Sequence, residues 1–202
     1  MKSISFFVCM MIFSLSFSQT KKTEWLLEKS RNNVNLSYRW IYLADSEKIR
    51  ELKAEFIINA QIDSILNQFT NSSNLKKWQN SADECKVTKY SDTRWETYLS
   101  FSLPWPLKSK DLVVENKLTK YTDYTLLRMS SSPNSEPIYE EKDRINSLES
   151  EWKFIPQKNG KTKVIYTTMT YDKPEFPSVL TDPIIQKKLF QSIDLLKQNA
   201  SK

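Results

Sequence analysis

The chain offers few side chains for nucleophilic, metal or cofactor chemistry. Its 202 residues include no histidine, two cysteines and a single glycine, Gly160. Without histidine there is no Ser-His-Asp triad, no Cys-His dyad and no HExxH zinc motif. Phosphate-binding loops and dinucleotide-binding turns need several glycines, because their backbones approach the ligand closely or adopt positive φ. The composition therefore argues against most familiar enzyme classes, and we predict no metal and no cofactor.

The remaining candidates for chemistry each have a plain structural alternative. Cys85 has no histidine to activate it, so we expect an unreactive thiol. Residues 139–143 hold adjacent carboxylates of the kind used in acid–base catalysis, but adjacent charges are also typical of a solvated turn. Lys110 and Asp111 are interpreted as a structural ion pair near the start of a strand, with a ligand contact as the alternative. No catalytic residue is predicted.

The first eighteen residues differ from the rest of the chain. Lys2 precedes an uncharged, apolar run from Ile4 to Phe17, and Ser16 and Ser18 place small residues before Gln19. This pattern is typical of a secretory signal peptide, which predicts an exported protein, periplasmic or secreted. The alternative is a membrane anchor, but the run is shorter than the roughly 20 residues that a spanning helix needs. We therefore divide the chain into a signal peptide, 1–18, and one domain, 19–202.

The charge distribution bears on the choice of partner. The net charge is +6, and 27% of the residues are charged. The lysines are scattered among acidic residues instead of forming a basic run, so nucleic acid is not a predicted partner. Weak, transient attraction to an anionic membrane surface is compatible with this charge.

Apolar residues at every second position predict strands through most of the domain. Lys158-Asn159-Gly160-Lys161 joins two of these runs, and Asn-Gly predicts a tight hairpin with positive φ at both residues. A turn is predicted at 44–46. The predicted strands are 34–42, 51–58, 85–87, 95–103, 112–118, 124–129, 152–154 and 164–171.

Helical spacing appears in three regions. A short helix is predicted over 23–30, and a helical region interrupted at 71–74 over 60–80. A closing helix is predicted to start with Asp182 as N-cap and Pro183 as its first residue, after a proline-rich loop, and to end near Asn199. The order of elements predicts an α+β fold in which one antiparallel sheet curls around the closing helix.

The segment from Leu103 to Val113, Leu-Pro-Trp-Pro-Leu-Lys-Ser-Lys-Asp-Leu-Val, lies between two central strands. Together with the element order, Trp25, Leu75-Lys76-Lys77-Trp78 and the closing helix, it resembles the START family of lipid-transfer domains over about residues 23–199. One departure is Lys110, where the family commonly has arginine, because lysine cannot make a bidentate fork with a carboxylate. The resemblance implies a helix-grip fold, a curved antiparallel sheet wrapped around a long C-terminal helix, with an apolar tunnel for one lipid or sterol-like ligand.

Inward side chains of such a sheet either line a cavity or fill a solid core. We name apolar candidates on the strands and the closing helix, and we add Trp105. Trp105 either acts as a gate residue that touches the membrane or lies in a rigid turn with its ring tucked against the protein. The candidate ligand-binding residues are Phe56, Leu99, Phe101, Trp105, Val114, Tyr166, Leu189 and Ile193.

Three functions fit these observations. The preferred one is a non-enzymatic carrier or sensor of a hydrophobic ligand. The second is an enzyme, of cyclase or hydrolase type, that acts on an apolar substrate in the same cavity. The third is an interaction module with a solid core.

The signal peptide generates the first prediction. The exported protein is expected to begin near Gln19, because cleavage follows the small residues Ser16 and Ser18. N-terminal sequencing or intact mass of the naturally exported protein measures this, and an exported chain that retains Met1 would contradict it.

Overall fold

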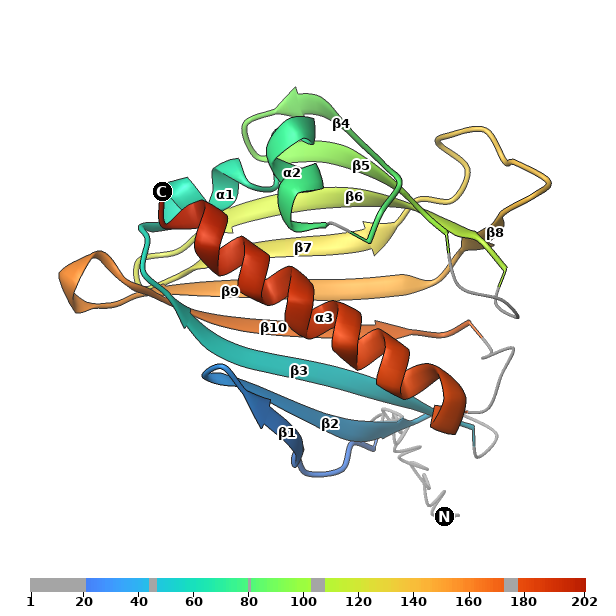
Figure 1. Ribbon diagram of the computed structural model, residues 1–202, viewed down its shortest axis with the longest axis horizontal. Coiled ribbons are helices and arrows are strands. Elements are labelled where there is room, and N and C mark those ends of the chain that lie inside the picture. The colour runs from blue at the N-terminus through green and yellow to red at the C-terminus, as the bar shows by residue number, and fades with distance from the viewer. Residues whose placement is uncertain (1–20, 44–46, 80, 103–107, 173–177) are drawn as a thin grey trace, which may run out of the picture.

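The computed structural model describes residues 21–43, 47–79, 81–102, 108–172 and 178–202. Within these residues, ten strands form one curved sheet, and the long C-terminal helix lies across its concave side (Figure 1). The predicted signal peptide 1–18, the turn at 44–46 and Trp105 fall outside the described residues, so these calls stay predictions.

The sheet is antiparallel apart from one short strand, β8, which pairs in parallel with β6. Its order is β1-β2-β3-β10-β9-β7-β6-β5-β4, so the two halves of the chain meet where β3 pairs with β10. The strands are β1 (Leu26–Arg31), β2 (Val34–Tyr42), β3 (Lys48–Ile58), β4 (Glu84–Ser91), β5 (Arg94–Phe101), β6 (Lys110–Lys120), β7 (Thr125–Ser131), β8 (Asp143–Ile145), β9 (Leu148–Pro156) and β10 (Thr162–Thr170).

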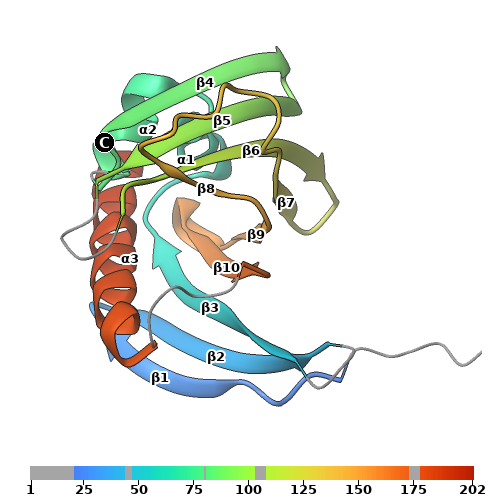
Figure 2. The ribbon, with the colours of Figure 1, turned by 90° about the vertical axis from the view of Figure 1, so that its right-hand side faces the viewer.

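Three α-helices complete the described fold: α1 (Ile62–Asn67), α2 (Ser72–Trp78) and α3 (Ser178–Ala200). Figure 2 shows the sheet curving from β4 round to β1, with α3 across the opening of the curve. The predicted α+β helix-grip fold is thereby confirmed, because the period-two runs form the sheet and the closing helix is gripped by it.

The prediction of a helix over 23–30 is wrong. Leu26–Arg31 is the edge strand β1, paired antiparallel with β2. Asn32 and Asn33, at φ 51° and 58°, form a two-residue hairpin turn between Arg31 and Val34. Asparagine tolerates this left-handed conformation better than most residues, and pairing with β2 stabilises the strand, whereas an isolated helix of this length is only marginally stable.

The hairpin at Asn159 and Gly160 is confirmed in conformation but is longer than a two-residue turn. The two residues have φ 60° and 68°, as expected for this pair. The last register pair is Pro156 with Thr162, and Lys158–Gly160 form a 3-10 turn inside it. The single glycine of the chain therefore occupies a left-handed position.

The predicted start of the closing helix is also wrong. Helix α3 begins at Ser178, so Pro183 lies inside it and Asp182 is not its N-cap. The Asp182 carboxylate instead accepts a hydrogen bond from Arg50 Nη1 at 2.5 Å. Pro183 is the sixth residue of α3, beyond the first turn, so it removes one backbone donor from the helix. The end at Ala200 agrees with the prediction.

The partner predicted for Asp111 requires a correction. Successive residues of a strand point to opposite faces, so Lys110 and Asp111 of β6 cannot share one side of the sheet. On the outer face, the Arg144 guanidinium makes a two-point contact with the Asp111 carboxylate, at 2.6 Å and 2.7 Å. Arg144 also donates to the carbonyls of Pro133 and Pro137, so it holds the β7–β9 connection against the sheet. The neighbouring carboxylate raises the pKa of Arg144 above its usual value.

This buried ion pair generates the second prediction. Replacing Asp111 by Asn leaves a buried arginine charge uncompensated, since the side chains of Arg144 and Asp111 are 4% and 1% exposed. The free energy of unfolding should fall by about 3–5 kcal/mol, measured by urea denaturation.

The matched control is Glu151→Gln, which breaks the exposed pair with Arg128. That change should lower stability by less than about 1 kcal/mol. Equal losses for the two variants would show that the Asp111 pair does not organise the fold.

Candidate functional site

The concave face of the sheet is built by strand alternation. On the central strands the inward positions are apolar and directly paired across strands: Phe56 of β3 faces Val164 of β10, which faces Phe154 of β9. One step along, Ala54 faces Tyr166, which faces Trp152. Antiparallel register thus places two rows of apolar side chains under α3.

An aromatic cluster closes one end of this face. Phe69, which lies between α1 and α2, has its ring centroid 5.0 Å from that of Trp78 and 5.1 Å from that of Trp152. Trp152 lies 4.2 Å from Tyr166 by the same measure. The Trp78 indole N–H donates to the Gln68 carbonyl at 2.9 Å, which satisfies the one polar group of that buried ring. The rings fill the space between the helices and the middle of the sheet.

Beside this cluster lies a cavity of about 190 Å³ between α3, α2 and the sheet. Tyr166 and Trp152 form part of its floor, and Leu189 and Ile193 of α3 form its opposite wall. Its lining residues are Trp78, Gln79, Ser81, Phe101, Trp152, Tyr166, Lys188, Leu189, Ser192 and Ile193. The lining is thus mostly aromatic and aliphatic.

Four of the predicted ligand-binding residues meet at this cavity: Phe101, Tyr166, Leu189 and Ile193. Three others belong to the buried core instead: Phe56, Leu99 and Val114 are 3%, 6% and 1% exposed and do not line it. Their strand alternation correctly indicated the inward face, but alternation does not tell a filled region from an open one.

Sequence reasoning missed the largest lining groups, Trp152 and Trp78, as well as Ser192. Trp152 lies in a predicted strand, and its pairing with Tyr166 across the Asn159-Gly160 hairpin is the signal that both side chains lie on the concave face. Trp78 closes the short helix α2, and no local pattern indicates that it reaches the sheet.

Neutral hydroxyl groups lie next to the aromatic floor. The Ser150 and Thr168 hydroxyls are 2.7 Å apart on paired positions of β9 and β10. Burial raises the pKa of the neighbouring Tyr166 phenol, although the Thr168 and Ser150 hydroxyls oppose the shift. Tyr166 is therefore uncharged at neutral pH, and this part of the site is polar without being ionic.

Polar contacts join α3 to the β1–β3 part of the sheet. Three of its residues, spaced four or eight apart and hence on one face of the helix, bond to β1, the β1–β2 turn and β3. The contacts are Arg50 to Asp182 at 2.5 Å, Gln186 to Glu28 at 2.6 Å and Asn32 to Asp194 at 2.8 Å. Leu189 and Ile193, each seven residues after one of these contacts, lie on the same face of α3 and border the cavity.

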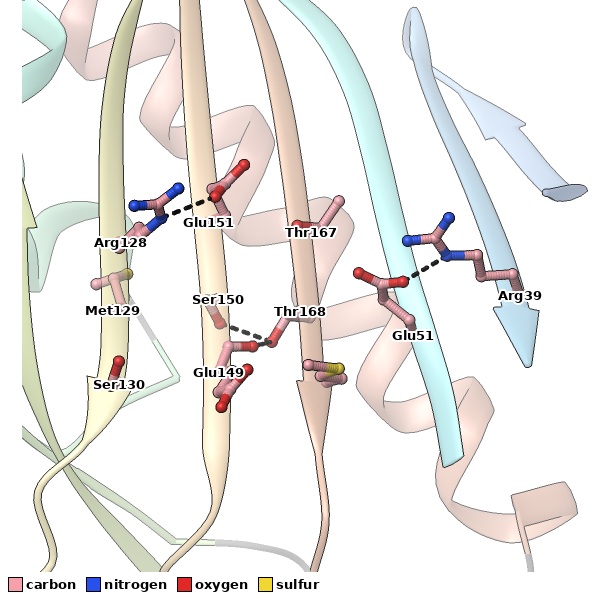
Figure 3. Close-up of a pocket in the computed structure, with 11 residues that line it drawn as sticks. Arg39, Glu51, Arg128, Met129, Ser130, Glu149, Ser150, Glu151, Thr167 and Thr168 are labelled. Carbon is pink, nitrogen blue, oxygen red and sulfur yellow. Dashed lines mark hydrogen bonds and ion pairs between the residues drawn. The ribbon is translucent and has the colours of Figure 1, made fainter. Parts of the chain in front are cut away.

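A second hollow, of about 330 Å³, lies on the opposite face of the sheet (Figure 3). It is lined by charged side chains from β2, β3, β7 and β9 and by uncharged side chains from β10, and α3 lies behind the strands in this view. Its charges are paired between neighbouring strands: Arg39 with Glu51 at 2.5 Å, and Arg128 with Glu151 at 3.2 Å. Cross-strand ion pairs of this kind stabilise a solvent-facing sheet surface.

Among the described residues, no group of three or more His, Cys, Asp or Glu side chains is placed to hold a metal ion. None of the described helices is both long and apolar enough to cross a bilayer.

Comparison with known proteins identifies the fold. No known protein-family profile matches the chain. An uncharacterised protein of Pseudomonas aeruginosa is 24% identical over 180 residues, which cover 89% of this chain and 88% of the relative. The crystal structure of a StAR-related lipid transfer protein from Xanthomonas axonopodis has a TM-score of 0.77 at 21% identity, covering 88% of this chain and 99% of that chain. Human StAR-related lipid transfer protein 5 has a TM-score of 0.70 at 14% identity, covering 87% and 86%.

The chain therefore has the helix-grip fold of StAR-related lipid-transfer (START) domains. This agrees with the resemblance inferred from the sequence, including the long closing helix and its place on the sheet.

The half-buried thiol of Cys85 generates the third prediction. Burial raises its pKa to about 11, so the thiolate fraction at pH 8 is roughly 100-fold below that of an ordinary cysteine. In the chain without residues 1–18, where Cys85 is the one cysteine, a disulfide reagent at pH 8 should react about 100-fold more slowly than with free cysteine.

The control is the same protein unfolded in urea, whose thiol should react at the ordinary rate. Equal rates in the folded and unfolded protein would contradict the burial of this group.

Proposed function

We propose that the protein binds an apolar small molecule, a lipid or a sterol-like compound, in the cavity between α3 and the sheet. In this proposal the protein carries its ligand without changing it chemically. The observation that carries the proposal is the apolar cavity lined by Trp152, Tyr166, Leu189 and Ile193.

The geometry of the fold supports this use of the cavity. A single helix packs against a broad concave sheet, and the aromatic cluster fills only part of the space beneath it. Inward side chains beyond the cluster, among them Met129 and Leu148, are only partly buried. Apolar side chains that stay partly open inside a fold lose contact energy unless a ligand covers them.

The cavity must widen to admit a lipid. At about 190 Å³ it is smaller than the roughly 300–1,000 Å³ of typical small-molecule sites. Helix α3 is held by polar contacts along its β1–β3 side, whereas Leu189 and Ser192 border the cavity. We expect the middle of α3, between the contacts of Asp182 and Asp194, to move away from the sheet when ligand enters.

The named relatives support the ligand class. The two solved structures described above are called lipid transfer proteins, and one of them is covered almost completely by this chain. The match in fold supports a site between a curved sheet and a C-terminal helix.

The proposal extends to export and to the membrane. Lys2 and the apolar run Ile4–Phe17 support secretion to the periplasm or beyond. Delivery of an apolar ligand then requires brief contact with a membrane surface, since such a ligand does not leave a bilayer readily for water. Two exposed apolar side chains are candidates for that contact: Tyr171, which precedes residues 173–177 in the sequence, and Ile185, which follows them.

Filling the cavity generates the fourth prediction. Leu189→Trp puts a larger ring into existing space, so the fold should persist while the affinity for diphenylhexatriene, a fluorescent hydrocarbon, falls tenfold or more. Fluorescence titration measures the affinity, and thermal unfolding checks the fold.

The matched control is Ile185→Trp, the same kind of change one turn earlier at a side chain that is 50% exposed and does not line the cavity. It should bind the probe as the wild type does. A wild type that binds no probe, or a Leu189→Trp variant that binds it unchanged, would refute the proposed function.

A further inference from the structure

Two buried polar groups on the concave face have no hydrogen-bond partner among the described residues. They are the indole Nε1 of Trp95 and the amide Oδ1 of Asn116. Both residues are 0% exposed. Trp95 of β5 and Asn116 of β6 are direct register partners, so their side chains start side by side on the same face of the sheet.

The orientation of the Asn116 amide follows from its other contacts. Its Nδ2 donates to the Trp95 carbonyl at 3.2 Å, the Val114 carbonyl at 3.2 Å and the Thr97 hydroxyl at 3.0 Å. Carbonyl oxygens only accept, so a flipped amide would set oxygen against oxygen. Oδ1 therefore points away from these three groups and is the acceptor without a partner among the described residues.

A buried donor and a buried acceptor without partners destabilise a protein unless something binds them. Trp95 Nε1 can only donate, and Asn116 Oδ1 can only accept. A hydroxyl group offers both functions that the pair lacks, because its oxygen can accept from an indole and its hydrogen can be donated to an amide.

The surroundings favour an uncharged partner. Thr97, Ser150 and Thr168, the polar side chains nearest in the sheet, are neutral and already engaged. The charged neighbour in the same row, Lys89 on the edge strand β4, is solvent-exposed and lies 3.8 Å from Asp92. A phosphate or carboxylate at Trp95 would therefore remain without a buried counter-charge.

One strand, β7, separates the strand of Asn116 from the strand of the cavity residue Trp152. Asn116 faces Met129 of β7, and Met129 faces Ser150 of β9, next to the cavity residue Trp152. Two strand spacings separate β6 from β9, roughly 10 Å. The side chain between them is a half-buried methionine, which repacks more easily than a branched or aromatic residue.

We propose that Trp95 and Asn116 bind the polar end of the ligand, and that the ligand is an uncharged apolar molecule carrying a hydroxyl group. This rests on the proposed function and specifies it: the apolar body lies in the cavity, and the hydroxyl reaches past Met129 to the two buried groups.

The test compares two competitors that differ only in the hydroxyl, 1-dodecanol and dodecane, as they displace diphenylhexatriene. The measured quantity is the ratio of their displacement constants. Comparing this ratio between a variant and the wild type cancels the difference in water solubility between the two competitors. Trp95→Phe, which keeps the ring and removes a donor that bonds to nothing in the fold, should reduce the advantage of dodecanol about tenfold. Asn116→Leu should do the same, and diphenylhexatriene, which has no polar group, should bind both variants as it binds the wild type.

The matched control is Tyr98→Phe, which removes a buried hydroxyl from the opposite face of the same strand. It should leave the ratio unchanged. If Trp95→Phe also leaves the ratio unchanged while diphenylhexatriene still binds, the hydroxyl site is refuted and the carrier function stands. If the wild type does not bind diphenylhexatriene, both proposals fail.

Discussion

The packing of aromatic rings around Trp152 is the interaction on which the rest of the structure depends. Phe69 and Trp78 come from the helical segment after β3, whereas Trp152 and Tyr166 come from the β9–β10 hairpin. These rings join the two halves of the chain at the point where β3 pairs with β10. Large aromatic side chains bury much surface for little conformational entropy, so a few of them can stabilise a domain that has no disulfide.

The same packing explains why a cavity exists. The rings fill the space under the C-terminal half of α3, and one helix is too narrow to fill the remainder of the curved sheet. Helix α3 is attached to β3 through Asp182 and to the β1–β2 turn through Asp194, while Leu189 borders the cavity. The structure thus combines a closed aromatic end with a cavity beside it.

The two faces of the sheet divide structural and binding roles. On the outer face, ion pairs such as Arg39–Glu51, and the buried contact of Arg144 with Asp111, satisfy charge locally and hold the β7–β9 connection in place. On the concave face of β5 and β6, two buried neutral groups, on Trp95 and Asn116, remain without partners among the described residues. Groups left unsatisfied inside an otherwise well-paired fold are more informative about ligand chemistry than the ion pairs that fill the outer hollow.

The sequence alone determined what depends on neighbours along the chain: which strand residues face inward, the left-handed conformation at Asn159 and Gly160, and the apolar stripe of the closing helix. Only the tertiary structure decided that Leu26–Arg31 is a strand, that Arg144 and not Lys110 pairs with Asp111, and that Leu189 borders a cavity while Leu99 is packed in the core. Alternation and spacing are local properties, whereas Asp111 and Arg144 are 33 residues apart. Whether an inward side chain meets another side chain or open space depends on such distant contacts, which no local pattern records.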